Sequence, residues 1–253
     1  MKNCPLFALS IMLVTGMTAT PAAADISARY EAQEKNAPFH MAMTLEIDLN
    51  GNERVQVAEQ PTYMLVLNNV TYMVSRGPAG VYVMRFDDVV TVIGEVAKRM
   101  GIDKAFASMP KNVAEKPPAI ASMGPKVVNG RTGTGYGISE NGARPVYAFV
   151  VISEDPKLAP LGAAFAKSFA QSSGYANKMF PGFGSMGGMF GPDAELFKKG
   201  APLSIVSMNL TDVSFAEIDD SRFALPGQPL SIDQIRQQYQ SFSAPPTLPA
   251  ARN

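Results

Sequence analysis

Cysteine and histidine are nearly missing from this sequence of 253 residues, which contains one of each, Cys4 and His40. Cys4 precedes the apolar run of an N-terminal leader, so the exported chain has no cysteine, and this excludes disulfides, thiol catalysis and cysteine metal sites. A Ser-His-Asp site would have to use His40. That residue lies on the more polar side of a predicted strand, where an exposed or hydrogen-bonded histidine is the ordinary outcome. No G-x-S-x-G nucleophile motif accompanies it, and we do not expect an enzyme.

An excess of one charge and a long apolar run are also missing. Lys and Arg together number 22, as do Asp and Glu. This balance argues against a nucleic-acid-binding protein, which needs a basic surface. After the leader, no apolar run approaches the roughly 20 residues of a membrane-spanning helix. We therefore do not expect an integral membrane protein.

Residues 1–24 have the pattern of a secretory signal peptide. Lys2 supplies the positive charge, and residues 6–17 form an apolar core that is short for a membrane span. A small-residue cleavage motif follows at residues 22–24. Cys4 lies ahead of the apolar core, whereas the acylated cysteine of a lipoprotein follows it. We expect cleavage before Asp25, a periplasmic location and no lipid anchor.

Residues 39–85 have the pattern of a β-meander, which we expect to organise the fold. Apolar and polar residues alternate without interruption over residues 39–49, the period of a strand with one covered face. Shorter strands are predicted at 54–58, 62–67, 70–75 and 81–86, separated by turn-forming residues such as those at 50–52. The alternation places one series of apolar side chains on the covered face of the first strand: Phe39, Met41, Met43, Leu45, Ile47 and Leu49.

The rest of the chain alternates between helices and strands. Residues 26–34 fit either a strand or a short helix. A helix capped by Asp87-Asp88 should end at Gly101, a short helix is expected at 103–108, and a connector is expected at 109–125. Strands are predicted at 126–128, 131–138, 146–153, 203–210 and 213–218, with a brief helix at 192–199.

A further helix is predicted after Asp155-Pro156, with an apolar stripe formed by Leu158, Leu161, Phe165 and Phe169. We interpret residues 25–230 as one domain, followed at 231–253 by a C-terminal helix that Ser231 caps and a disordered tail.

Motifs that would indicate a cofactor or a metal are weak in this sequence. Residues 182–187 match G-x-G-x-x-G, but they lack the preceding strand and following helix of a dinucleotide site. Asp87-Asp88 is better explained as a helix cap, and Asp219-Asp220 as a turn. Neither pair has the spacing of a calcium loop. We therefore predict no cofactor and no metal.

Methionine is the least ordinary feature, with 15 in the chain. Methionine fills irregular apolar spaces and adapts to variable apolar ligands, and its thioether also suits Cu(I). Residues 172–191 form a Gly-, Met- and Phe-rich segment that we predict to be a flexible loop and a candidate partner-docking segment. Its apolar residues are Met179, Phe180, Phe183, Met186, Met189 and Phe190.

The order of these features resembles a bacterial periplasmic family of unknown function, itself similar to the outer-membrane lipoprotein carriers. The resemblance is carried by V-N-G-R-T-G-T-G-Y-G-I at 128–138, D-P-x-L-x-P-L-G at 155–162 and F-A-L-P-G at 223–227. It implies an α+β fold in which a curved antiparallel sheet forms an open half-barrel with helices packed in its mouth. It also implies an apolar interior and no catalytic residues.

The sequence leads to one main hypothesis and two alternatives. The main hypothesis is a non-enzymatic periplasmic protein that binds a lipid, a lipoprotein acyl chain or a partner's hydrophobic segment inside the half-barrel. The alternatives are an envelope scaffold that docks a partner protein through the loop at 172–191, and copper binding by methionine. The residues expected to line the apolar site are Met41, Met43, Leu45 and Met64.

Overall fold

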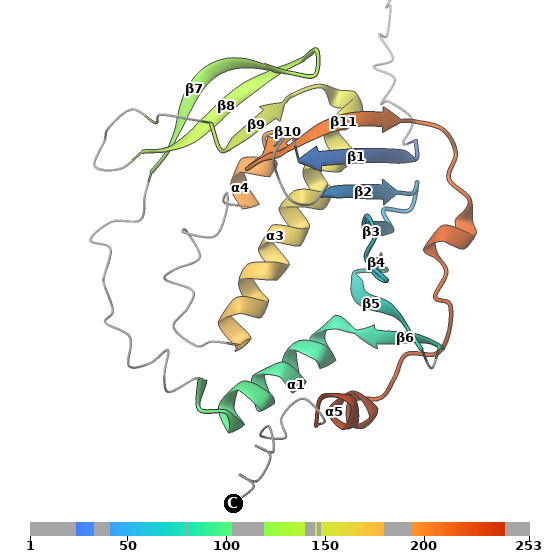
Figure 1. The fold of residues 1–253 in the computed structure, drawn as a ribbon. Helices are drawn as coiled ribbons and strands as arrows, with labels where there is room; N and C mark the ends of the chain where they lie inside the picture. Colours follow the sequence, from blue (N-terminus) through green and yellow to red (C-terminus); the bar gives the residue numbers. More distant parts are fainter. Residues whose placement is uncertain are drawn as a thin grey trace, which may run out of the picture.

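The fold is built on one large antiparallel sheet. A computed structural model describes residues 24–32, 41–78, 80–102, 119–139, 145, 148–179 and 194–240. Within these residues, eleven strands follow the order β6-β5-β4-β3-β2-β1-β11-β10-β9-β8-β7, and every neighbouring pair of strands is antiparallel (Figure 1). The sheet is open, with β6 and β7 as its edges. This confirms the expected α+β class.

The strands of the meander are β1 (Ile26–Ala32), β2 (Ala42–Ile47), β3 (Glu53–Val57), β4 (Thr62–Leu67), β5 (Val70–Gly77) and β6 (Gly80–Arg85). The later strands are β7 (Ala119–Val128), β8 (Arg131–Ser139), β9 (Val150–Ser153), β10 (Ala201–Ile205) and β11 (Met208–Ser214). The helices are α1 (Phe86–Arg99), α3 (Ala159–Met179), α4 (Ala194–Phe197) and α5 (Ile232–Gln240), with short 3-10 turns at Pro156–Leu158 and Asp220–Phe223.

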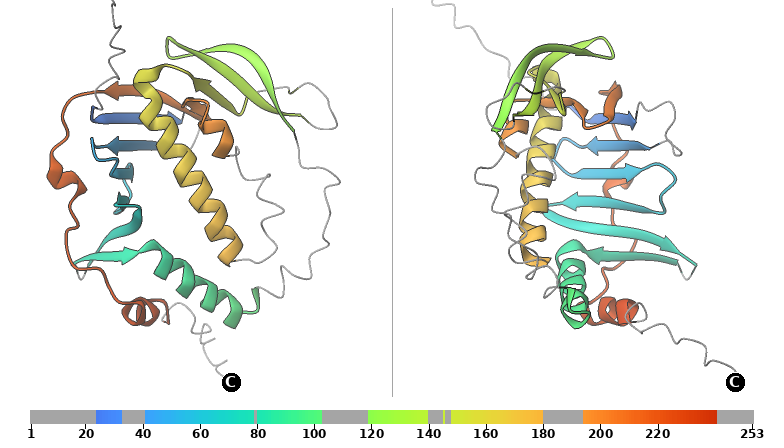
Figure 2. Two further views of the ribbon diagram at one scale, coloured as in Figure 1. Left: turned by 180° about the vertical axis from the view of Figure 1, so that it is seen from behind. Right: turned by 60° about the vertical axis from the view of Figure 1, so that its left-hand side comes forward.

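Helix α3 packs on one face of the sheet, which we call the inner face (Figures 1 and 2). Leu161 and Phe165 of this helix are buried against Ala28 and Tyr30 of β1 in the largest core cluster. Tyr30 is fully buried, meets Phe165 edge to face at 5.5 Å, and donates a hydrogen bond from its hydroxyl to the carbonyl of Pro202. The apolar stripe predicted for this helix is therefore confirmed as the stripe that attaches it to the sheet.

The hairpin turns predicted from the sequence are confirmed. Gly51 takes a φ of 75° between β2 and β3, and the carboxylate of Asp48 accepts hydrogen bonds from the backbone N–H groups of Asn50 and Asn52. Asn129, at a φ of 48°, begins the turn between β7 and β8. The left-handed backbone at these positions is the reason that glycine and asparagine are found there.

The expectation that β2 has only one covered face is wrong. Leu45 and Ile47 are buried as predicted, but Glu46 on the opposite face is also buried. The segment after β11 runs along the outer face of the sheet and covers part of it (Figure 1). Arg222 in this segment makes a two-pronged ion pair with Glu46, with N–O distances of 2.6 to 3.0 Å. A charged residue is therefore buried because a distant cation pairs with it.

The same segment covers an apolar patch on the outer face. Leu65, Val74 and Val83 are buried there with Leu225 packed against them. The backbone N–H of Leu230 also donates to the carbonyl of Val83. These contacts hold the segment that leads to α5 against the sheet.

Helix α5 packs against α1, beside the β6 edge of the sheet (Figure 2). Ile235 is fully buried in this contact, and Arg236 bonds to Glu95 of α1 at 2.8 and 3.0 Å. Ser231 caps α5 as predicted: its hydroxyl accepts from the backbone N–H of Gln234, whose side chain accepts from the N–H of Ser231.

Other boundaries differ from the predictions, and the strand predicted at 213–218 is the end of β11, which stops at Ser214. The strand predicted at 203–210 is two strands, because Val206 adopts a φ of 54° and turns the chain between β10 and β11. The connector predicted at 109–125 gives way to β7 at Ala119, and the strand predicted from residue 146 begins at Val150. Helix α1 begins at Phe86 with no side-chain cap, so Asp87 and Asp88 lie in its first turn rather than capping it. Their negative charges still stabilise the helix, because the N-terminal end of the helix dipole is positive.

Within the described residues, none of the helices is both long enough and apolar enough to span a membrane. Residues 1–23 of the predicted leader, His40, the predicted short helix at 103–108 and the tail from residue 241 lie outside the described residues.

Candidate functional site

The candidate site is an apolar cavity of about 150 Å³ between α3 and the inner face of β2 and β3. The sheet contributes Met43, Leu45 and Val55. The helix contributes five residues, which follow its 3.6-residue period along one side. The helix residues are Ala164, Phe165, Ser168, Phe169 and Ser172.

Small residues on α3 keep this space open. Ala164, Ser168 and Ser172 recur every four residues, so they lie above one another on the same side of the helix. Phe165 and Phe169 each directly follow one of these small residues. Their rings stack against the ring of Phe197 of α4, with centroid distances of 5.6 and 4.8 Å. The aromatic rings thus hold α3 in place, while the small side chains leave the space between helix and sheet unfilled.

A row of methionines continues from the cavity along the inner face. Directly opposed residues on neighbouring antiparallel strands point to the same face. The register opposes Leu45 to Val55, Val55 to Met64, Met64 to Met73 and Met73 to Met84. Two residues of the cavity wall are therefore followed by three methionines, one on each of β4, β5 and β6. We call these three residues the methionine row.

Three of the four lining residues predicted from the sequence belong to this surface. Met43 and Leu45 line the cavity, and Met64 begins the methionine row. Met41 precedes β2, is 49% exposed and is not among the cavity residues.

The sequence prediction did not include the residues that α3 contributes to the cavity. The sequence predicts the apolar stripe of this helix but no cavity beside it. The signal that marks the cavity is the series of small residues beside the stripe, at positions 164, 168 and 172.

The predicted docking loop at 172–191 is in part helical. Helix α3 continues to Met179, because no proline interrupts it after Ser172 before that point and Gly174 is accommodated within the helix. Met179 is the last residue of the helix, and its side chain is outside the described residues. Phe180, Phe183, Met186, Met189 and Phe190 also lie outside the described residues.

A buried ion pair adjoins the cavity. Glu53 lies two residues before Val55 on the same face of β3, and Lys167 directly precedes Ser168 on α3. The ammonium nitrogen of Lys167 lies 3.2 Å from Oε1 of Glu53, whose side chain is 4% exposed. Burial raises the pKa of the Glu53 carboxyl above its ordinary value, and the charge and hydrogen bond of Lys167 oppose that rise.

This pKa shift predicts a pH-dependent effect of Glu53→Gln on stability. Because the pKa of Glu53 is higher in the folded than in the unfolded chain, the folded state holds more protons between the two values. Glu53 therefore lowers the free energy of unfolding increasingly as the pH rises through that window. Below the pKa of the unfolded chain this destabilisation is absent. The melting temperature of Glu53→Gln minus that of the wild type should increase from pH ~4 to pH ~8. A difference that stays constant over this range, measured by circular dichroism, would contradict the assignment.

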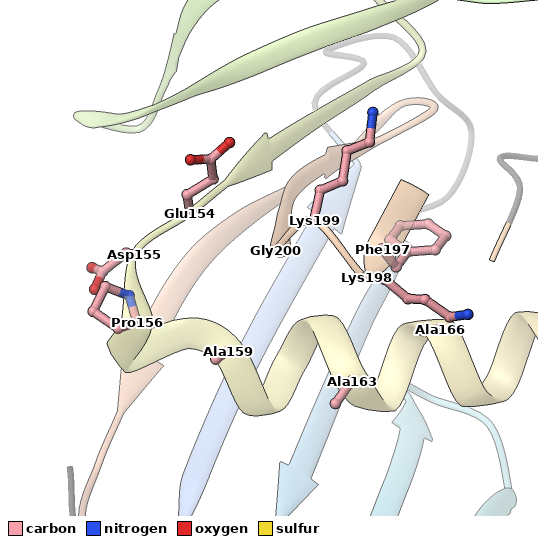
Figure 3. Close-up of a pocket in the computed structure, with 10 residues that line it drawn as sticks. All are labelled: Glu154, Asp155, Pro156, Ala159, Ala163, Ala166, Phe197, Lys198, Lys199 and Gly200. Carbon is pink, nitrogen blue, oxygen red and sulfur yellow. The ribbon is translucent and has the colours of Figure 1, made fainter. Parts of the chain in front are cut away.

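A larger cleft of about 360 Å³ lies at the N-terminal end of α3 (Figure 3). Glu154 and Lys199 extend away from the helix there. Three charged groups of the cleft are engaged within the protein: Lys199 lies 4.9 Å from the ring centroid of Tyr136, Lys198 pairs with Glu195, and Asp155 accepts from the N–H of Lys157. Because local contacts engage most of the charged groups of this cleft, we place the candidate site at the apolar cavity.

No metal-binding cluster of three or more His, Cys, Asp or Glu side chains occurs among the described residues. Comparison of the chain with protein-family models, with curated proteins and with solved structures finds no match.

Proposed function

We propose that this protein is a non-enzymatic periplasmic protein that binds an apolar ligand, a lipid or an acyl chain, between α3 and the inner face of the sheet. In this proposal the curved sheet acts as an open half-barrel and α3 lies in its mouth. The observation that supports the proposal is the apolar cavity lined by Met43, Leu45, Val55 and one side of α3. Removal of apolar surface from water, at about 25 cal/mol per Å², supplies the driving force without any polar motif.

The size of the cavity defines how a ligand would enter it. Pockets for drug-sized ligands begin at about 300 Å³, so a space of about 150 Å³ holds only part of an acyl chain. Met64 and Met73 extend the apolar surface beyond the cavity and are only partly buried, whereas Met84 is buried in the core with residues of α1 and α5 and Met73 packs against that core. Because methionine has three rotatable bonds, these side chains can repack around a chain that continues along the row.

Copper binding is the second candidate, and the methionine row is the observation that favours it. Met64, Met73 and Met84 bring three thioethers to neighbouring strands on one face, and soft thioether ligands select Cu(I). The same row also suits an apolar wall, which needs no metal.

Met73→Leu separates the two functions, because leucine keeps an apolar side chain of similar size but removes the thioether. We expect the purified full-length protein to take up an apolar fluorescent dye such as N-phenyl-1-naphthylamine, and the variant to keep most of that affinity. Cu(I) titration against a competing chelator provides the second measurement. The copper proposal would replace the lipid proposal if two results were found together. The wild type would bind Cu(I) tightly but take up no dye, and Met73→Leu would abolish the Cu(I) binding.

A further inference from the structure

Glu53 and Lys167 form a polar bridge between β3 and α3, and neither residue lines the apolar cavity itself. Their neighbours Val55 and Ser168 both line the cavity, one from the sheet and one from the helix. A second polar bridge follows one turn later on α3, where Thr71 of β5 donates to Gln171 at 3.3 Å. Two polar bridges thus connect α3 to the inner face of the sheet, and the buried Val66 lies between Glu53 and Thr71 in the register.

The carboxylate of Glu53 has an unused acceptor. Oε1 faces the ammonium of Lys167, but Oε2 is buried and has no hydrogen-bond partner among the described residues. Buried polar atoms in folded proteins nearly always have a partner, so an unpartnered one requires an explanation. A ligand that supplies the missing donor explains it.

We propose that Glu53 and Lys167 bind the polar head of a neutral acyl lipid whose head carries a hydroxyl or an amide N–H. The inference rests on the proposed function, since the acyl chain occupies the apolar cavity. Oε2 is closed to solvent and Glu53 does not line the cavity, so the carboxylate has to turn toward the cavity before the hydroxyl or N–H donates to Oε2. Lys167, whose side chain is 30% exposed, keeps N–H groups beyond the one that faces Glu53 and donates to the ester or amide carbonyl of the ligand.

The charges of the pair select a neutral head over an anionic one. A fatty-acid carboxylate has no hydrogen to donate to Oε2 and is repelled by the ionised Glu53 beside Lys167. A simple ester has the carbonyl that Lys167 requires but lacks the donor that Glu53 requires. A monoacylglycerol or a fatty amide has both.

The test compares ligands with one acyl chain and different heads. Decanoylglycerol, methyl decanoate and decanoate compete for N-phenyl-1-naphthylamine bound to the full-length protein. We expect decanoylglycerol to bind about tenfold more tightly than methyl decanoate, the effect of one hydrogen bond to a charged group. Glu53→Met should remove this discrimination and leave the affinity for methyl decanoate. Glu217→Met, at an exposed position, is the matched control and should keep it.

The outcomes separate this inference from the proposed function. Equal binding of decanoylglycerol and methyl decanoate by the wild type would overturn the inference while the apolar site stands. Tightest binding of decanoate would also overturn it, in favour of Lys167 as an anion site. If no ligand displaces the dye and no dye binds, the proposed function itself fails. Should Glu53→Met melt well below the wild type, the isosteric Glu53→Gln replaces it. That variant should reduce the discrimination several-fold, and retention of the full discrimination would overturn the inference.

Discussion

Ser168→Phe is expected to lower the affinity for an apolar ligand at least tenfold while the protein stays folded. Ser168 lies on the cavity side of α3 and is only partly buried, so a phenyl ring can occupy the cavity without displacing core side chains. Filling an apolar space in a folded protein is usually tolerated when total volume allows it. The loss of about 1.4 kcal/mol or more of binding free energy is measured by dye displacement, and folding by the melting temperature.

Ala170→Phe is the matched control for this substitution. Ala170 lies two residues further on the same helix and is exposed, so the same ring is added outside the cavity. The control should bind like the wild type. If Ser168→Phe also binds like the wild type, the ligand does not occupy the cavity and the proposed site is wrong. If Ser168→Phe lowers the melting temperature strongly, Ser168→Met offers a smaller side chain for the same comparison.

Gly162→Ala is expected to reduce the free energy of unfolding by about 2 to 3 kcal/mol, near the upper end for overpacking. A Cβ at this position of α3 would lie 2.6 Å from the carbonyl oxygen of Gly200 and 2.9 Å from that of Phe197. Both obstacles are backbone atoms, which cannot rotate away as a side-chain end can. The close approach of α3 to the α4–β10 connection therefore depends on glycine.

Gly174→Ala on the same helix should have the opposite effect. Apart from its chain neighbours and the helix's own backbone, no atom of the described residues lies within 4 Å of the Cβ that this substitution adds. Alanine loses less backbone entropy than glycine on helix formation, so the free energy of unfolding should rise by roughly 0.5 to 1 kcal/mol. Chemical denaturation of both variants provides the comparison. Equal effects of the two substitutions would show that α3 does not pack against Gly200 as described.

The two glycine substitutions also bear on the site. Phe197 and Gly200 flank the end of α4, and Phe197 stacks against the two aromatic residues of α3 that border the cavity. A shift of α3 away from Gly200 would change the space between helix and sheet. Gly162→Ala should therefore weaken ligand binding in addition to stability, whereas Gly174→Ala should not.

Local patterns in the sequence determined the elements of the meander and their turns. Period-two alternation needs only neighbouring residues, and the left-handed turns need glycine or asparagine at the turn itself, as at Gly51 and Asn129. The apolar stripe of α3 was equally local, because residues three and four apart share one side of a helix. The short strands around Val206 were missed because nothing in their apolar pattern indicates a left-handed residue.

The tertiary structure decided which elements are neighbours, and with them the site. The sheet pairs β1 with both β2 and β11, joining the two ends of the domain. It buries Glu46 through an arginine 176 residues away. Glu53 and Lys167 are each unremarkable in the sequence, and only the packing of α3 on β3 makes them a buried pair. Burial and pairing are sums of contacts between distant segments, whereas periodicity and turn chemistry depend on the residues within each segment. The strands and helices were therefore predictable from the sequence, but the cavity between them was not.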